Sequence, residues 1–375
     1  MRNPIFFIII YSIFTLLGIY VYRYLLRIVD LTKLNRKGKL VRLAAALISA
    51  GLMYSVTRFV GYGLVLMTHI LIIAWILDGI HFITKRVNKS FDVDSRLNKL
   101  YKSGTIPIIL TAIILTYGFF NMRAVIQTDY EVKASKPIRQ EGYTIALVSD
   151  LHYPTTMKGK ELTTYVEKIS ANNPDFVVLA GDIVDEGTSK EEMKESLGIL
   201  GQIKNKYGIY YVYGNHDSSS YSTDKNFTKH ELYETLIENN IVVLEDSVHT
   251  INDEIAILGR ADAGYGENSG RAKQEQLLAQ VDNEDYLILL DHKPKDLKEN
   301  AKLGIDLQLS GHTHAGQLWP AGIIGEWLGT NEQNYGLRTN GEYTSIVTSG
   351  IAGWGNSLRT AKRSEYVIIE LNPGK

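Results

Sequence analysis

Short apolar runs that each end in polar side chains recur between Thr144 and Leu371, and they constrain the fold more than any other feature of the chain. Near-continuous apolar runs of this length are typical of strands that are covered on both faces of a sheet. Amphipathic stretches with helical periodicity separate several of these runs. The pattern therefore predicts a layered α/β domain with mixed sheets.

The expected elements follow from this periodicity and from the turn residues between the runs. Strands are predicted at Thr144–Ser149, Asp175–Ala180, Ile209–Tyr213, Ile241–Leu244, Ile255–Leu258, Tyr286–Leu290, Asp306–Leu309, Ser345–Thr348 and Tyr366–Leu371. Helices are predicted at Gly159–Ala171, Lys190–Asn205, Phe227–Asn239 and Ala272–Val281.

The sequence of 375 residues divides into three parts by composition. Residues 1–123 are mainly apolar and predict a multi-pass transmembrane helical domain. Residues 124–142 predict a connector with an edge strand, and residues 143–375 the α/β domain. The net charge of −1, and the lack of a basic stripe with interleaved aromatic residues, give no reason to expect a nucleic-acid partner.

Five of the predicted strands are followed by Asp, Asn or His, at the edge where open α/β sheets bind ligands. Each such residue alone is ordinary, because Asp and Asn are common at turns and helix N-caps. Together they provide the bridging carboxylate and the several N or O ligands that two metal ions ~3.5–4 Å apart require. Asp182 is the natural bridge, since it follows a glycine. The candidate ligands are Asp150, His152, Asp182, Asn215, His292, His312 and His314.

The stretch Ser310–Gln317 has two imidazoles two residues apart, so that in an extended segment they point the same way. Gly311 and Gly316 lack a Cβ and allow a sharp turn and a close approach to the backbone. The chain contains no cysteine, so any metal must be held by His, Asp, Asn or Glu.

These blocks, taken in order with Gly214-Asn215-His216-Asp217, resemble the calcineurin-like metallophosphoesterase superfamily over Thr144–Leu371. The sequences HAGQ and DHKP and the preceding apolar spans resemble its membrane-associated bacterial branch. The resemblance implies a four-layer αββα fold and two divalent metal ions, for which the ligand types suit Mn, Fe or Zn. It assigns one ion to Asp150, His152, Asp182 and His314, and the other to Asp182, Asn215, His292 and His312. It also implies that His216 lies over the substrate phosphate and is oriented by Asp217.

The implied function is that of a membrane-anchored, metal-dependent phosphoric ester hydrolase. A hydroxide that bridges the metals would attack a phosphodiester, pyrophosphate or phosphomonoester, as part of a lipid or envelope metabolite. His216 would stabilise the developing charge or protonate the leaving oxygen. Two alternatives remain: a phosphodiesterase or phosphatase for soluble nucleotides, and a membrane sensor whose metal domain binds a phosphorylated ligand without turnover.

Four helices account best for the N-terminal part. Pro4–Tyr22 and Thr105–Met122 are each about long enough to cross a ~30 Å hydrocarbon core, and Leu43–Ile83 is read as two helices joined by a turn. The loops on either side of Leu43–Ile83 are rich in Lys and Arg, which gather on the cytoplasmic side. Four crossings place both termini and the α/β domain outside the cytoplasm. A single crossing by Leu43–Ile83 would reverse the domain.

Three ionisable side chains fall within these spans. We interpret Asp78 and His81 as lying at the membrane interface, and His69 as hydrogen-bonded to a neighbouring helix. The alternative is a functional role, because an ionisable group in a membrane is costly.

Three further features lie near the candidate ligands in the sequence. The segment Ala315–Gly341 contains several Trp, Ile and Leu residues and is either a lid packed on the domain or a surface for an acyl chain or the bilayer. Arg359 is either a clamp for a second phosphate or part of a surface salt bridge. The loop Asp262–Arg271 is expected to border the cleft.

Overall fold

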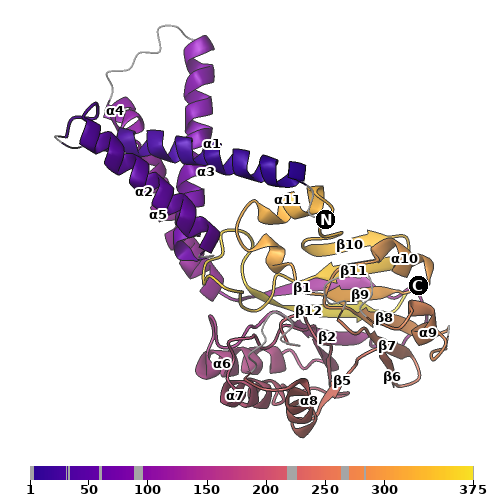
Figure 1. Ribbon diagram of the computed structural model, residues 1–375. Helices are drawn as coiled ribbons and strands as arrows, with labels where there is room; N and C mark the ends of the chain where they lie inside the picture. Colours follow the sequence, from indigo (N-terminus) through magenta and orange to yellow (C-terminus); the bar gives the residue numbers. More distant parts are fainter. Residues whose placement is uncertain are drawn as a thin grey trace. The chain divides into compact units, whose positions relative to one another are not determined.

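The computed structural model describes residues 4–30, 32, 34–58, 61–87, 96–217, 226–262, 270–282 and 284–374 (Figure 1). The chain forms two compact units, Met1–Tyr117 and Gly118–Lys375. The division falls inside a helix, six residues before the boundary expected at residue 123, so the last turn of that helix belongs to the second unit.

The first unit is helical. Its elements are α1 (Pro4–Val29), α2 (Lys39–Arg58), α3 (Tyr62–Val87), α4 (Arg96–Lys102) and the larger part of α5 (Thr105–Arg123). The stretch Leu43–Ile83 is divided into two helices, as expected. Among the described residues, α3 and α5 are long and apolar enough to cross a membrane.

A polar cluster lies among these helices. The Asp78 carboxylate forms an ion pair with Arg27 at 2.9 Å and accepts hydrogen bonds from the hydroxyls of Tyr20 and Tyr101 at 2.9 and 2.7 Å. His69 Nδ1 donates to the carbonyl of Val65, one turn back in the same helix, at 2.8 Å. The expectation that His69 bonds to a neighbouring helix is therefore wrong, because its own helix supplies the acceptor.

The second unit contains two mixed six-stranded sheets, ordered β1-β12-β2-β3-β4-β5 and β10-β11-β9-β8-β7-β6. The expected α/β class with mixed sheets is confirmed. The strands of the first sheet are β1 (Ile126–Lys133), β2 (Tyr143–Val148), β3 (Phe176–Leu179), β4 (Ile209–Tyr211), β5 (Ile241–Val243) and β12 (Glu365–Asn372). Those of the second are β6 (Ser247–Ile251), β7 (Ile255–Gly259), β8 (Tyr286–Leu290), β9 (Leu307–Ser310), β10 (Gly336–Asn340) and β11 (Tyr343–Val347).

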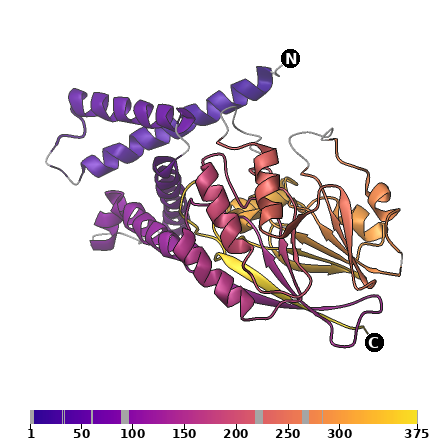
Figure 2. The ribbon, with the colours of Figure 1, turned by 90° about the horizontal axis from the view of Figure 1, so that it is seen from below.

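Figures 1 and 2 show the course of these strands and of the helices around them. Three hydrophobic clusters hold the layers of this unit together. The middle cluster lies between the two sheets and includes Ile145 and Val178 of the first and Ile288 and Leu309 of the second. A second cluster lies between the first sheet and α6 (Gly159–Ser170), α7 (Lys190–Leu200) and α8 (Lys229–Glu238). The third covers the outer face of the second sheet with the short helices α9 (Gln274–Leu278) and α10 (Leu297–Lys302). Each central strand is thus buried on both faces, which explains its near-continuous apolar sequence.

Local sequence signals set the helix starts. Ser189 Oγ accepts a hydrogen bond from the backbone N–H of Glu192, and the Glu192 carboxylate accepts one in return from the backbone of Ser189. Thr228 and Glu231 form the same capping box at the start of α8. These reciprocal bonds satisfy backbone groups that a helix end leaves without partners.

Two strands were not expected from the sequence, β6 and β10. Both lie at the outer edges of the second sheet, where each pairs with only one neighbour and is partly exposed. Edge strands with one solvated face need no continuous apolar run, so their sequences carry a weak strand signal.

Candidate metal centre

The parallel register of the central strands brings their carboxyl ends to one edge. Val148 of β2 lies opposite Leu179 of β3, which lies opposite Tyr211 of β4. In the second sheet, Leu290 of β8 lies opposite Leu309 of β9. The polar side chains that follow these residues therefore meet between the two sheets.

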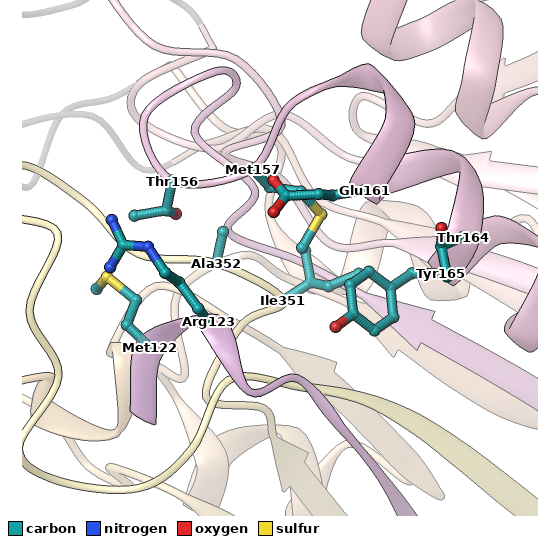
Figure 3. Close-up of a pocket in the computed structure, with 9 residues that line it drawn as sticks. All are labelled: Met122, Arg123, Thr156, Met157, Glu161, Thr164, Tyr165, Ile351 and Ala352. Carbon is teal, nitrogen blue, oxygen red and sulfur yellow. The ribbon is translucent and has the colours of Figure 1, made fainter. Parts of the chain in front are cut away.

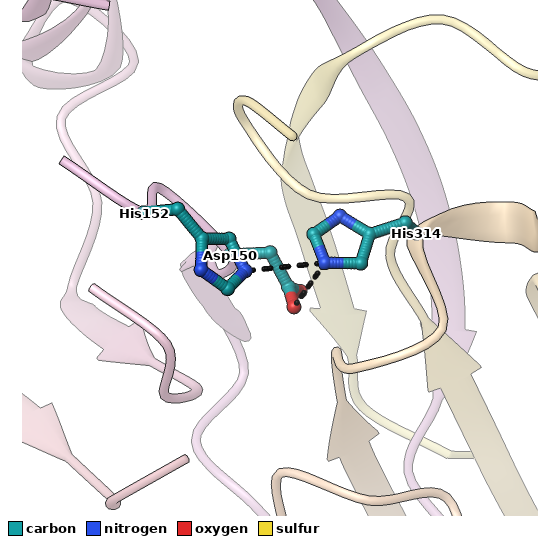
Figure 4. Close-up of side chains that lie close together, drawn as sticks. All are labelled: Asp150, His152 and His314. Atoms are coloured by element: carbon teal, nitrogen blue, oxygen red, sulfur yellow. Dashed lines mark hydrogen bonds and ion pairs between the residues drawn. The ribbon is translucent and has the colours of Figure 1, made fainter. Parts of the chain in front are cut away.

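The first group of side chains comprises Asp150, His152 and His314 (Figure 4). The Nε2 atoms of the two imidazoles face one another at 3.2 Å, and His314 Nε2 lies 3.4 Å from an Asp150 carboxylate oxygen. Asp150 and His152 are fully buried. Two imidazole nitrogens and a carboxylate oxygen aimed at one point are the donor set that a divalent transition metal prefers.

The second group comprises Asp182, His292 and His312. His292 Nδ1 donates to the Ala180 carbonyl at 2.7 Å, which fixes the tautomer and directs Nε2 to Asp182 at 3.0 Å. A backbone carbonyl that orients an imidazole in this way is typical of metal-binding histidines.

The Asp182 carboxylate lies between the two groups. It is 3.0 Å from His292 Nε2 and 3.7 Å from His152 Nε2. Asn215 is buried directly after Gly214, whose backbone contacts Asp182. The structure thus brings six of the seven candidate ligands together, and it buries the seventh, Asn215, beside the turn that carries Asp182. This set of imidazole, carboxylate and amide donors fits divalent metal ions.

The charges at the site depend on one another. Burial opposes the charged form of Asp182, but the imidazoles of His292 and His152 hold its pKa well below the usual range. Burial likewise opposes a charged His292, whereas the Asp182 carboxylate raises the pKa of His292 to about 10. Burial and the neighbouring His292 lower the pKa of His312 to about 3. The site therefore holds one firmly ionised carboxylate among imidazoles of unlike basicity.

Five of the seven candidate ligands have a left-handed backbone. Their φ angles are 56° for Asp150, 45° for His152, 53° for Asp182, 71° for His312 and 51° for His314. Such conformations cost of order 1–3 kcal/mol for a non-glycine residue and persist where the surrounding structure enforces them. Their concentration at one edge of the sheets supports a functional site there.

Two close approaches confirm the expectation for the glycines of Ser310–Gln317. A Cβ on Gly311 would lie 2.0 Å from Ser149 Oγ and 2.4 Å from an Asp150 carboxylate oxygen. Gly316 has a φ of 77°, and a Cβ there would lie 2.2 Å from the backbone nitrogen of Gly322.

The structure corrects the role expected of Asp217. Its buried carboxylate accepts hydrogen bonds from the backbone N–H groups of Asp182, Ile183, Val184 and Gly214, at 2.6 to 3.0 Å. It therefore holds the turn that carries Asp182 and does not orient the His216 imidazole.

Glu186 occupies the position expected of Asp217. A Glu186 carboxylate oxygen lies 2.9 Å from His216 Nδ1, and Asp185 lies 3.4 Å from His152 Nδ1. Sequence reasoning missed both acids. The available signal was their place three and four residues after Asp182, in the turn that follows the same strand.

Arg359 is neither a phosphate clamp nor part of a surface salt bridge. Its guanidinium is fully buried and donates to the carbonyls of His314, Ser349 and Ala352. Burial lowers the pKa of Arg359 to about 10, so the group is still charged at neutral pH. Arg359 thus fixes the backbone behind a candidate metal ligand.

The loop expected to border the cleft falls mainly on residues 263–269, which lie outside the described residues. At its ends, Asp262 pairs with Lys293 at 3.0 Å and Arg271 with Asp291 at 2.5 Å.

A separate cavity of about 120 Å³ lies between the end of α5 and α6 (Figure 3). Its lining includes Met122, Tyr165 and Ile351 but none of the seven candidate ligands.

Residues 143–316 match the family model of the calcineurin-like phosphoesterases. The α/β domain is thus similar to this family. A transmembrane protein with a metallophosphoesterase domain from Danio rerio is 31% identical over 290 residues, which are 72% of this chain and 63% of that relative. An uncharacterized metallophosphoesterase from Campylobacter jejuni is 28% identical over 277 residues, 72% of this chain and 69% of the relative. The relatives thus include vertebrate as well as bacterial proteins.

A solved dimetal phosphatase from Danio rerio is similar at 14% identity, over 56% of this chain and 88% of that chain, with a TM-score of 0.39. The chain spans less than two thirds of the length of the Danio rerio transmembrane relative.

Replacing Gly214 by alanine is expected to disrupt the site, because the new Cβ would lie 2.1 Å from an Asp182 carboxylate oxygen. We expect the metal affinity of Gly214→Ala to be lower by at least about tenfold. Mutation of residues that position a metal ligand typically lowers metal affinity by about 10- to 100-fold. Metal content after dialysis against buffered metal measures this. Gly187→Ala is the control, since a Cβ there meets nothing within 4 Å. Equal metal retention by the two variants would contradict the assigned role of Asp182.

Proposed function

We propose that this protein is a membrane-anchored, metal-dependent phosphoester hydrolase with two divalent ions, Mn, Fe or Zn, in its α/β domain. The observation that carries the proposal is the position of the Asp182 carboxylate, which lies 3.0 Å from His292 Nε2 and 3.7 Å from His152 Nε2 and so joins two groups of candidate ligands. The family match supports the same reaction class. Asp150, His152, Asp182 and His314 would hold one ion, and Asp182, Asn215, His292 and His312 the other.

When bound, the two ions neutralise phosphate oxygens and activate water near neutral pH. The protein's residues would then position the substrate and handle the proton. His216 is the candidate for contact with the phosphate, because its ring lies beside His152 at a centroid distance of 4.9 Å. Its backbone N–H donates to the Asp182 carboxylate at 2.8 Å, which ties its position to the candidate bridging ligand.

Glu186 would keep His216 protonated. Burial opposes the charged ring, but the hydrogen bond to the Glu186 carboxylate raises the pKa of His216 above its ordinary value. A protonated imidazole near neutral pH can stabilise charge on the phosphate or protonate the leaving oxygen. His216 is thus the proposed general acid, with Glu186 as its orienting group.

The proposed substrate is a phosphodiester, pyrophosphate or phosphomonoester of a lipid or envelope metabolite. The apolar helices α3 and α5 support a membrane location, as do the relatives named as transmembrane proteins. We propose four crossings within residues 1–123, a connector at 124–142 and the catalytic domain at 143–375. Both termini and the catalytic domain would then lie outside the cytoplasm.

Asp182→Asn tests the enzyme and its two-metal site together. Loss of the shared carboxylate should lower the content of both ions and reduce metal-dependent hydrolysis of a chromogenic phosphodiester by at least about a hundredfold. Elemental analysis and turnover with Mn²⁺, before and after chelation, measure the two effects. Unchanged turnover in Asp182→Asn would refute the mechanism. Stable binding of two ions without turnover in the wild type would favour the sensor.

Glu186→Gln tests the orientation of His216. The amide cannot stabilise a protonated imidazole as a carboxylate does, so kcat should fall by about tenfold or more, up to the roughly 10²–10⁴-fold that general acid catalysis contributes. Metal content should stay at the wild-type level, because Glu186 is not among the seven candidate ligands. Steady-state kinetics and elemental analysis check both points. Glu191→Gln is the control, since Glu191 lies exposed in the first turn of α7. Equal kinetics for the two variants would remove Glu186 from the mechanism.

The orientation can be tested with single cysteines, because the chain has none. A membrane-impermeant maleimide applied to intact cells should label Ile237→Cys on the exposed face of α8. It should not label Lys37→Cys, in the basic loop between α1 and α2, until the cells are permeabilised. The reverse pattern would place the catalytic domain in the cytoplasm.

A further inference from the structure

The segment Trp319–Leu328 presents large apolar side chains to solvent. Trp327 is 83% exposed and Ile323 is 65% exposed, and Trp319, Ile324 and Leu328 are exposed as well. The interpretation of this segment as a lid packed on the domain is therefore wrong. Contiguous exposed apolar surface usually marks a binding surface.

The helix within this segment, α11 (Ala321–Trp327), is oriented with its apolar face outward. The side of the helix that faces the domain carries Gly322. A Cβ at this position would lie 2.2 Å from the side-chain nitrogen of Asn334, so only glycine fits there. Glu326 fastens the helix to the domain by accepting from the backbone of Asn334 at 2.5 Å and from Arg338 at 2.8 Å. A helix that packs on a core has the opposite arrangement, with its apolar face inward.

The same segment is hydrogen-bonded to the loop that receives the last turn of α5. The backbone N–H of Trp319 donates to Thr360 Oγ1 at 3.0 Å. The neighbouring Arg359 N–H donates to the carbonyl of Gly118 at 3.0 Å, and the Asn121 amide donates to the Arg359 carbonyl at 3.0 Å. In the proposed topology α5 crosses the membrane, so its last turn marks where the chain leaves the hydrocarbon. The exposed apolar segment starts next to this point.

Exposed cations flank the same place. Arg123 ends α5 with its guanidinium stacked 3.6 Å from the centroid of the Phe119 ring, and Lys362 and Arg363 are exposed just after the loop. The Arg123 guanidinium also donates to the carbonyls of Phe119 and Ser357, which holds its charge at the end of the helix. Basic residues there are attracted to anionic headgroups, and tryptophan favours the interfacial layer.

Gln317, two residues before the exposed segment, is connected through Trp354 to His216, the candidate residue for contact with the phosphate. The Gln317 side chain donates to the carbonyl of Trp354 at 2.9 Å and accepts from its backbone N–H at 3.1 Å. The Trp354 ring lies 5.6 Å from the His216 ring, measured between centroids. If the apolar segment lies in the interfacial layer of the bilayer, the phosphate of a lipid headgroup there would lie close to His216.

We propose that Trp319–Leu328 inserts into the interfacial layer of the bilayer that α5 crosses, so that the metal site opens at the membrane surface and takes the phosphoester headgroup of a lipid. The inference rests on the proposed membrane anchoring and hydrolase function. A bilayer is the occupant of this apolar face, because the face adjoins the last turn of α5 and is flanked by exposed cations.

The insertion can be measured without any activity, because the chain contains no cysteine. Spin labels at Ile323→Cys and Trp327→Cys, in the full-length protein in phosphatidylcholine–phosphatidylglycerol nanodiscs, should relax more with oxygen than with a water-soluble nickel complex. A label at Ile237→Cys, exposed on α8, should show the opposite preference. If all three labels favour the nickel complex, the face does not contact the bilayer. Spin–spin coupling between copies would instead identify a protein interface and overturn the inference.

The substrate is tested with Ile323→Ser/Trp327→Ser. Removal of two apolar anchors should lower turnover of a phosphatidic acid or an isoprenoid diphosphate in nanodiscs by about tenfold or more. Turnover of a soluble chromogenic diester should stay within about twofold, which shows that the metal site is intact. Equal effects on both substrates would overturn the lipid assignment. If the wild-type protein hydrolyses neither substrate, the proposed function fails, while the spin-label result still decides the insertion.

Discussion

The ion pairs of the Asp182 carboxylate with His292 and His152 connect the two groups of candidate metal ligands. Asp182 follows a strand of the first sheet, yet its charge is stabilised by His292, which follows a strand of the second. Two imidazoles on different sheets thus approach one anion, and the attraction offsets part of the cost of burying it. Packing of the two sheets and formation of the site are therefore the same event.

This arrangement demands an unusual backbone. Asp182 has a φ of 53°, and the turn that holds it is fastened by four backbone N–H groups bonded to Asp217. Gly214 must pass close enough to Asp182 that no side chain fits between them. The strain of the left-handed residues is thus balanced by a buried, charge-assisted hydrogen-bond network. Asp217 contributes to the site as a structural support.

The sequence was sufficient to predict the α/β class and to single out six residues that the structure brings together, because each follows an apolar strand and the carboxyl ends of parallel strands meet at one edge. It did not reveal the hydrogen bond between Glu186 and His216, because that contact depends on the conformation of the turn that follows β3. It gave no sign of β10, since an edge strand has little need of apolar side chains. Arg359 was misread because its acceptors are carbonyls, which every residue carries and no pattern marks.

The last turn of α5 has a consequence for dissecting the protein. Met122 and Asn121 are buried, Asn121 donates to the carbonyl of Arg359, and Ser364 donates to the carbonyl of Met122. A soluble fragment that begins at Ala124, as composition alone would suggest, would lose these bonds and the buried side chains of Asn121 and Met122. The final residues of an apolar helix are here a structural component of the globular domain. The smallest fragment that folds as the intact protein does must therefore retain residues 118–123.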